Sequence, residues 1–297
     1  MTISNNFMQY KSQFFLTLKI IIVCFILFVV CGGGFLLWQH YYPVKAYAPW
    51  QYKVIHKNIT KASALYKDKQ GNLMVAEELN NSQGRIIKIA VDGTRTTLFD
   101  KLNKPDGISA FQGGIVFSQE GGIYPVTLLK HYQTTNLFIG TNVQGLTPYG
   151  QYLYAVEDRG VNSRILRYDA STGDVTIVRE KLNEAETLAI CPNGNKYYNE
   201  KKIHQIKQLT ADGKDPIILD YKKTREPSIL QCDENGLWIS EDSTHRARLL
   251  LLTSDGKLQT ILSHLRAPQQ LLKITEDTYY LAEGGRNRVL KLKKLSK

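Results

Sequence analysis

A glutamate that closes a short apolar run recurs along this chain. Its six copies are spaced by 43, 37, 43, 41 and 42 residues and stand at Glu77, Glu120, Glu157, Glu200, Glu241 and Glu283. An upstream series with spacings of 43, 38, 42, 42 and 41 stands at Ser63, Asp106, Gln144, Glu186, Ser228 and Gln269. Because the two series drift together, they indicate six copies of one unit. Units of this length are typical of the four-stranded blades of a β-propeller.

The sequence between these markers favours strands joined by tight turns. Short runs rich in Val, Ile, Leu and Tyr are broken by pairs such as Asp92-Gly93, Asn193-Gly194 and Asp255-Gly256. No long amphipathic helical pattern follows Trp50. This spacing predicts an all-β meander of hairpins.

The two ends of this region predict how the ring of blades closes. The last copy contains only three strand-like runs before the sequence ends. Residues 51–57 align with the fourth run of the first complete copy, with Ile55 over Leu98 and Ile59 over Leu102. We therefore predict an all-β, six-bladed β-propeller over residues 50–297. An N-terminal strand would close it, because closure removes the unpaired edges of a sheet.

The first fifty residues have a different composition. Ile20 to Trp38 is free of charge and long enough for about 28 Å of helix, close to the hydrocarbon thickness of a bilayer. We predict an N-terminal tail over 1–18, one transmembrane helix over 19–38 and a linker over 39–49. A signal anchor is favoured over a cleaved signal peptide because the apolar run is long, although Ala46-Tyr47-Ala48 matches a cleavage pattern.

Charge predicts the orientation of this anchor and its surroundings. Lys19 abuts the apolar run, whereas the nearest charge beyond it is Lys45. By the positive-inside rule we expect a single-pass membrane protein with an extracytoplasmic propeller, whether periplasmic, lumenal or extracellular. The formal net charge is +11. A basic face near an anionic membrane explains this excess better than nucleic-acid binding, because no motif of stacking aromatics is present.

Three segments of the repeats resemble a known group of proteins. Residues 153–173 (LYAVEDRGVNSRILRYDASTG), 237–256 (LWISEDSTHRARLLLLTSDG) and 279–292 (YYLAEGGRNRVLKL) are similar to the NHL, strictosidine-synthase-like and SMP-30/gluconolactonase group of six-bladed propellers. The resemblance extends over residues 50–297. It implies a propeller fold and allows several activities, since the group includes calcium-dependent lactonases and esterases, a plant condensing enzyme and non-catalytic binding modules.

The same resemblance implies a calcium site at the mouth of the central channel. Pro105-Asp106-Gly107 is similar to the aspartate-bearing turn of the lactonases, and this carries Asp106 over as a ligand. We expect Gln144 and Glu186 to complete the site, with Glu120 and Glu200 beside or behind them. Calcium accepts carboxylate and amide oxygens in flexible geometry. The sequence departs from the lactonases at Lys61-Ala62-Ser63 and at Gln144-Gly145.

The recurring glutamates themselves are expected to hold the blades together. Four of them precede an arginine at the start of the next apolar run, which predicts the pairs Glu77–Arg85, Glu157–Arg164, Glu241–Arg248 and Glu283–Arg288. The second and fourth copies lack this arginine. Their glutamates are therefore the ones assigned to the calcium site, with backbone hydrogen bonding inside their own blades as the alternative.

Two further residue types complete the sequence predictions. His245 is a candidate general base on the face of the channel mouth, although a solvated histidine is the more common outcome beside two arginines. Cys191 and Cys232 are one repeat apart, and we expect buried free thiols because inner strands of neighbouring blades do not normally bring Cα atoms within disulfide range. No P-loop, HExxH, GxSxG or Cys-x-x-Cys motif is present.

Two classes of function remain from the sequence. The first is a membrane-anchored hydrolase of lactones or esters that uses a divalent cation at the channel mouth. The second is a non-catalytic propeller that binds a small molecule, protein, peptide or glycan there, and a strictosidine-synthase-like enzyme is a further reading of the resemblance. We favour the hydrolase on the resemblance alone.

Overall fold

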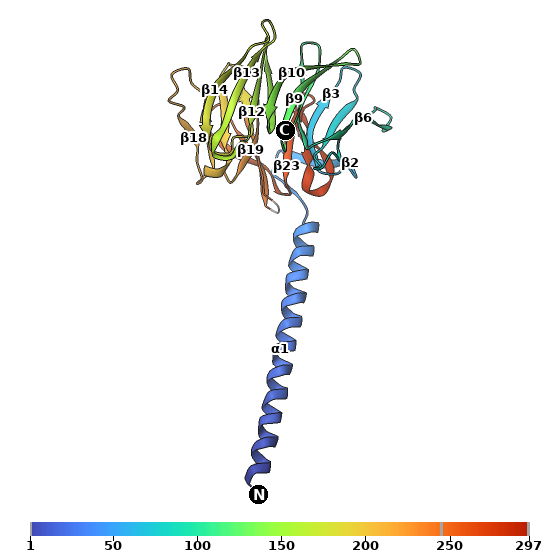
Figure 1. Ribbon diagram of the computed structural model, residues 1–297, viewed down its shortest axis with the longest axis vertical. Helices are drawn as coiled ribbons and strands as arrows, with labels where there is room; N and C mark the ends of the chain where they lie inside the picture. The colour runs from blue at the N-terminus through green and yellow to red at the C-terminus, as the bar shows by residue number, and fades with distance from the viewer. Residues whose placement is uncertain (1, 244–245, 296–297) are drawn as a thin grey trace. The chain divides into compact units, whose positions relative to one another are not determined.

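The computed structural model describes residues 2–243 and 246–295. The chain separates into two compact units at the boundary between Pro43 and Val44. The first unit is the helix α1 (Thr2–Tyr41), so the predicted tail is helical from Thr2. Within the described residues, its segment Phe14–Trp38, of mean hydropathy 3.0, is the one helical stretch long and apolar enough to cross a membrane (Figure 1).

The second unit is the predicted six-bladed β-propeller. Each described blade is an antiparallel sheet of consecutive strands, and the sheets surround a central channel. The first strand of each blade is innermost, and the second and third follow outward. The first three blades are β3 (Ala62–Lys67), β4 (Leu73–Glu77), β5 (Gly84–Ile89) and β6 (Arg95–Leu102); β7 (Pro105–Phe111), β8 (Gly114–Gln119), β9 (Ile123–Lys130) and β10 (Gln133–Thr141); and β11 (Val143–Tyr149), β12 (Tyr152–Glu157), β13 (Ser163–Asp169) and β14 (Val175–Leu182).

The other three blades follow the same order, with one change in the last. Three short 3-10 helices, η1 (Gly160–Asn162), η2 (Lys201–Ile203) and η3 (Gly284–Arg286), lie between second and third strands. The strands are β15 (Leu188–Ile190), β16 (Lys196–Glu200), β17 (Gln205–Gln208) and β18 (Ile217–Leu219); β19 (Pro227–Asp233), β20 (Gly236–Glu241), β21 (Ala247–Leu252) and β22 (Leu258–Leu265); and β23 (Pro268–Lys273), β24 (Thr278–Glu283), β25 (Arg288–Lys294) and β2 (Trp50–Lys57).

The strand β2 closes the ring as the sequence predicted. It pairs antiparallel with β25, from Trp50 opposite Lys294 to Lys57 opposite Arg288. A second N-terminal strand, β1 (Lys45–Ala46), lies inside the predicted linker and pairs with β22 of the fifth blade. The chain before β2 thus contacts the blade that precedes the closing blade.

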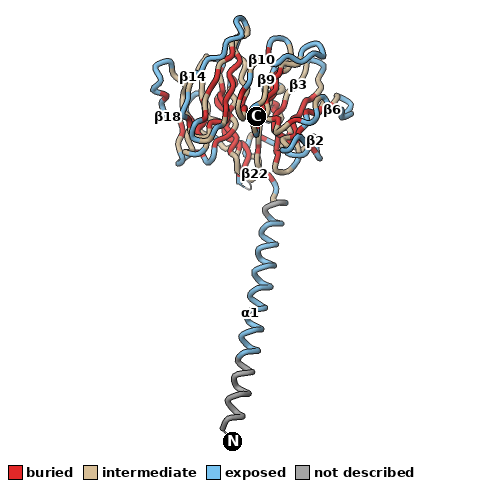
Figure 2. Tube along the Cα trace, viewed as in Figure 1, coloured by how far each residue is buried: buried red, intermediate tan, exposed pale blue. Residues whose placement is uncertain are grey.

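Most of the buried residues lie in the strands of the propeller (Figure 2), and their side chains form clusters between neighbouring blades. One apolar cluster lies at each junction of the described blades, for example Leu65, Val75 and Val289 between the first and last blades. Each sheet therefore buries both of its faces against its neighbours. This explains why the second strands are apolar at consecutive positions instead of alternating with polar residues.

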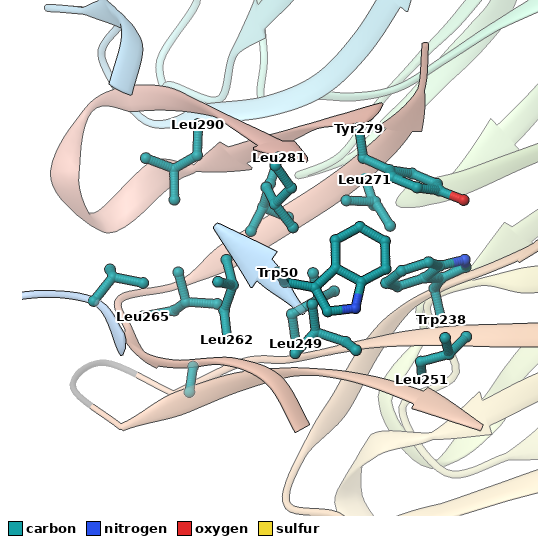
Figure 3. Packing of buried hydrophobic residues seen from close by; sticks show 14 residues of the cluster. Trp50, Trp238, Leu249, Leu251, Leu262, Leu265, Leu271, Tyr279, Leu281 and Leu290 are labelled. Atoms are coloured by element: carbon teal, nitrogen blue, oxygen red, sulfur yellow. The ribbon is translucent and has the colours of Figure 1, made fainter. Parts of the chain in front are cut away.

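The largest aromatic side chains lie where the ring closes. Trp50 of β2 is 6% exposed and lies edge-on to Trp238 and Tyr279, at ring-centroid distances of 5.5 and 5.8 Å (Figure 3). Buried Asp233 accepts hydrogen bonds from Trp238 Nε1 at 3.0 Å and from the Tyr279 hydroxyl at 2.5 Å. These bonds satisfy the polar atoms of both rings, so the closing strand gains aromatic packing without an unpaired buried group.

We predict that Trp50→Ala destabilises the ring at this junction. Removing a buried tryptophan leaves a cavity, and such changes cost roughly 3 to 5 kcal/mol of unfolding free energy. The matched control is Tyr132→Ala, because Tyr132 is fully exposed at 102%. Thermal or urea unfolding of the full chain checks the difference. Equal stability of the two variants would show that Trp50 does not secure the closure.

Candidate functional site

The glutamates at the ends of the second strands are structural, as the sequence predicted for most of them. In each case one carboxylate oxygen accepts the backbone N–H of a residue in the preceding connection, such as Thr60 for Glu77 at 2.9 Å and Thr141 for Glu157 at 2.7 Å. The four predicted arginine pairs are all formed. Each glutamate therefore joins one blade to the connection that enters it.

The second and fourth blades keep this arrangement with other residues. Glu200 accepts the backbone N–H of Asn183 at 2.9 Å and pairs with Lys207 in place of an arginine. In the second blade the strand ends one residue early, and Gln119 accepts the backbone N–H of Asn103 at 2.8 Å. Glu120 is therefore one position out of register with the other glutamates. Glu200 thus bonds a backbone amide of the connection that enters its blade, and its ion pair is with the third strand of the same blade.

The residue that follows the structural glutamate or glutamine lies at the same end of the channel in every repeat. Here the mouth is defined by these positions in the six repeats, which are Glu78, Glu120, Asp158, Lys201, Asp242 and Gly284. The sequence prediction identified only Glu120 among them. The repeat carried part of the signal, because an acidic residue follows the aligned glutamate in three of the six copies, at Glu78, Asp158 and Asp242.

Two lysines hold the carboxylates of the mouth in pairs. Lys104 Nζ lies 3.1 Å from Glu78 Oε1 and also contacts Glu120 Oε2. Lys201 Nζ lies 2.8 Å from Glu186 Oε1 and 2.5 Å from Asp242 Oδ2. Burial alone lowers the pKa of each lysine, but the two carboxylates beside each one outweigh it and raise that pKa. Both lysines are therefore charged at neutral pH.

Asp106 is the second residue of β7, and its carboxyl group forms no ion pair with Lys104 or Lys201 in the described structure. Burial raises its pKa well above the ordinary range, and the charges of Glu120 and Glu78 and a hydrogen bond with Glu120 raise it further. Since two nearby carboxyl groups resist simultaneous ionisation, this arrangement favours the protonated form of Asp106. That form has a single O–H, which it can donate either to Glu120 or to a molecule in the channel.

Glu186 lies before β15 in the fourth blade and is also perturbed. Burial raises its pKa to about 8, and the charges of Asp242 and Asp158 act in the same direction. The contact with Lys201 opposes this shift without cancelling it. Near neutral pH the group is therefore close to its point of titration.

The remaining members of the upstream series divide into two kinds. Gln144 donates from Nε2 to Asp158 Oδ2 at 3.4 Å and borders the channel. Ser63 and Ser228 instead donate to backbone carbonyls, those of Pro105 and Ser240, at 3.0 and 3.4 Å. The structure thus brings Asp106, Gln144 and Glu186 to one side of the mouth, while the serines support the inner strands.

A cavity of about 260 Å³ occupies the channel behind the mouth. Its walls are the inner strands, which contribute Asp106, Ser109, Gln144 and Gln231 together with apolar side chains such as Leu146 and Leu272. Asp106 is the one ionisable side chain among these lining residues, and burial favours its neutral form. A space of this kind suits a small molecule that bonds through hydroxyl and carbonyl groups.

These residues do not fit the predicted calcium site. Glu200 is committed to Asn183 and Lys207, and the ammonium groups of Lys104 and Lys201 contact Glu120 and Glu186. Within residues 2–243 and 246–295, no three His, Cys, Asp or Glu side chains are grouped closely enough to hold a metal ion. His245, the candidate general base, lies outside the described residues.

The prediction of two free thiols in the propeller is wrong. Cys191 and Cys232 form a disulfide with a Cα–Cα distance of 4.8 Å. Cys191 follows the three-residue strand β15 and Cys232 lies in β19, at the same height on neighbouring inner strands. The expectation that inner strands stay too far apart fails here because these two strands approach each other at the inner end of the cavity, which Cys232 borders.

Comparisons with known proteins agree on the fold. No family model matches the chain, and no curated protein matches its sequence. Among solved structures, a gluconolactonase from Xanthomonas campestris has a TM-score of 0.70 at 13% identity, with 84% of this chain and 91% of that chain covered. An auxiliary nutrient binding protein from Bacteroides thetaiotaomicron has a TM-score of 0.63 at 16% identity, with 80% and 69% covered.

A third neighbour has a different described activity. Virginiamycin B lyase from Staphylococcus aureus has a TM-score of 0.59 at 11% identity, with 83% of this chain and 100% of that chain covered. At such low identities the similarity establishes a shared architecture. The second unit of this chain is a six-bladed β-propeller whose structural neighbours include gluconolactonases.

We predict that Glu186 makes the stability of the propeller fall as pH rises. Its pKa is about 8 in the folded chain against an ordinary value of 4.5. Between these values the folded chain holds a proton that the unfolded chain has released, so the free energy of unfolding decreases by about 1 kcal/mol per pH unit. Glu186→Gln removes this dependence.

Urea unfolding of both proteins between about pH 5 and 9 measures the effect. The stability of Glu186→Gln relative to the wild type should increase up to about pH 8 and then level off. Glu276→Gln is the control, because Glu276 is exposed at the far end of the propeller. Parallel pH profiles for wild type and Glu186→Gln would contradict the assignment.

Proposed function

We propose that this chain is a membrane-anchored propeller that binds a small uncharged molecule of the sugar-lactone class in its channel. The observation that carries the proposal is the polar but uncharged lining of the cavity, with Asp106, Ser109, Gln144 and Gln231 around it. Hydroxyl and carbonyl groups of a sugar ring match amide, hydroxyl and protonated carboxyl groups. A charged ligand would lack a counter-charge at this level of the channel, because the nearby lysines and carboxylates are paired with each other.

The structural neighbours support this ligand class without establishing it. They include proteins described as a gluconolactonase and as an auxiliary nutrient binding protein. One activity opens a sugar lactone, and the other description concerns binding of a nutrient. A small hydroxylated ligand is compatible with both descriptions. No feature of the cavity supports the alternative of a protein or peptide ligand.

Hydrolysis of the lactone is a second candidate, which the Asp106–Glu120 pair favours. Water would add to the ring carbonyl, and the bond from the carbonyl carbon to the ring oxygen would break. Asp106 would give its proton to the departing oxygen while Glu120 accepts the proton of the attacking water. The raised pKa of Asp106 favours the protonated form that a general acid requires. No divalent cation is needed in this scheme.

The disulfide supports the proposed extracytoplasmic location. Structural disulfides persist in oxidising compartments and are rare in the cytosol of most cells. Cys191 and Cys232 lie in the propeller, whereas the two other cysteines, Cys24 and Cys31, lie in the apolar helix. Both the disulfide and the charge beside the apolar run therefore favour a propeller on the outer side of the membrane.

We predict that the full chain in detergent binds glucono-1,5-lactone and the ring polyol that lacks its carbonyl. Gln144→Ala should weaken binding of the polyol on the order of tenfold, because one amide side chain then leaves hydrogen bonds unmade. Gln70→Ala, at an exposed turn, is the matched control. Isothermal calorimetry measures both. If neither ligand is bound by the wild type, the sugar-lactone proposal fails.

The same proteins separate binding from hydrolysis. Asp106→Asn keeps the shape and the hydrogen-bonding capacity of the side chain but removes the acid. We expect it to bind the polyol like the wild type and to lose lactone opening, measured by acid release in the presence of a chelator. Opening that requires added calcium would instead restore the metal site that the sequence predicted.

We also predict that Cys191 and Cys232 resist alkylation until the protein is reduced, because they form a disulfide. Denatured without a reductant, the protein isolated from its membrane should label at Cys24 and Cys31, and reduction should expose two more thiols. The double variant Cys191→Ser, Cys232→Ser should label equally in both conditions. Labelling at all four positions before reduction, or complete resistance of the propeller to protease added outside the cell, would reverse the proposed topology.

A further inference from the structure

The exposed charges of the propeller are distributed unevenly between its two ends. At the mouth end, the connections and strand ends carry exposed lysines and arginines at Lys45, Lys57, Lys61, Lys101, Arg159, Lys181, Lys202, Lys222, Lys223, Arg225 and Arg246. Among the described residues, the exposed carboxylates at this end are Asp100, Glu180 and Glu226. We call these basic residues the mouth rim. It surrounds the mouth carboxylates, which Lys104 and Lys201 already pair.

The opposite end of the propeller carries charges of both signs, with exposed lysines at Lys69, Lys130, Lys214, Lys257, Lys293 and Lys294. Its hairpin turns expose acidic side chains at Asp92, Asp174, Asp212, Glu234, Asp255 and Glu276. Several of these carboxylates are balanced by neighbouring lysines, for example Asp255 by Lys257 at 2.7 Å. The excess of exposed positive charge is therefore concentrated at the mouth end, where exposed basic residues outnumber exposed carboxylates.

The chain enters the propeller at this basic end. Lys45 pairs with Ser263, close to the end of β22 that leads through Arg266 into the inner strand β23 at the mouth. Trp38 is the last residue of the apolar segment, and seven residue steps separate it from Lys45. Even fully extended, that length of chain reaches only about 25 Å. A bilayer around the apolar segment is thus within reach of the end that carries the mouth rim.

We infer that the mouth rim docks on the anionic phospholipid headgroups of the membrane that holds the anchor. The inference rests on the proposed anchoring, and it specifies which end of the propeller contacts the membrane and which class of lipid it contacts. Basic side chains held within a Debye length of an anionic surface gain attraction that sums over the residues. Docking in this way would turn the channel opening toward the lipid and leave the opposite end facing water.

Hydrogen exchange of the full chain in lipid nanodiscs tests the inference. One disc contains phosphatidylcholine alone, and the other contains phosphatidylcholine mixed with phosphatidylglycerol. We expect exchange in the mouth-end segments 158–162 and 220–226 to slow on the order of tenfold in the anionic disc. Exchange in the opposite turns 211–214 and 253–257 should stay unchanged, and high salt should remove the difference.

A matched pair of variants assigns the effect to the rim. The triple variant Lys222→Glu, Lys223→Glu, Arg225→Glu should abolish the lipid dependence. These three side chains are exposed, and the described contacts of these residues involve only their backbone atoms. Lys214→Glu with Lys257→Glu, at the opposite end, should preserve it. Equal exchange in both discs, or equal loss of the lipid dependence in both variants, would overturn the inference.

Two further readouts keep this test separate from the proposed function. Incorporation into the disc reports the anchor, and polyol binding reports the channel, so either can succeed while the lipid dependence fails. Inorganic phosphate added to the phosphatidylcholine disc checks for capture of a free anion. The same slowing with phosphate alone would overturn docking on lipid in favour of a soluble anion.

Discussion

The propeller depends on one recurring interaction, a side-chain acceptor at the end of each second strand, which is a buried glutamate in five blades and Gln119 in the second. A carboxylate there accepts a backbone N–H from the connection that enters the blade and pairs with a cation on the third strand, as Glu157 does with Thr141 and Arg164. A buried charge of this kind is tolerated only when its partners are complete. The position therefore fixes the height of each blade relative to its neighbour, and the residue that follows it is turned toward the channel. The positions of the mouth residues therefore follow from the contacts that hold each blade to its neighbour.

The sequence predicts the fold well because the fold repeats. Each blade is a local meander, and two markers in register identify it six times, so errors in one copy are corrected by the others. Closure by β2 followed from counting strands at the two ends. The site was harder, because its residues are the departures from the repeat. A shift of one residue at Gln119 moved Glu120 from the structural position to the mouth, and a shift of this size does not change the apparent spacing enough to be seen.

The disulfide shows a second limit of sequence reasoning. A separation of one repeat correctly places Cys191 and Cys232 at matching heights, but the distance between two inner strands varies around the ring. The shortness of β15 and its approach to β19 are tertiary properties, and the repeat pattern does not contain them. The ion pairs of the mouth could not be predicted from the sequence for a related reason. Lys104 and Lys201 come from different parts of their blades, and only the assembled ring brings each one between two carboxylates.

The way the N-terminal strands are joined to the ring has a mechanical consequence. Any tension along the chain from the anchor acts first on β1, whose two residues pair with β22, and only afterwards on β2. Two paired residues can be peeled apart and re-form at low force, whereas the eight residues of β2 must be sheared along their whole length from β25. Under such a load the short pairing of β1 with β22 would separate before that of β2. The seam that holds the ring closed is spared from that load.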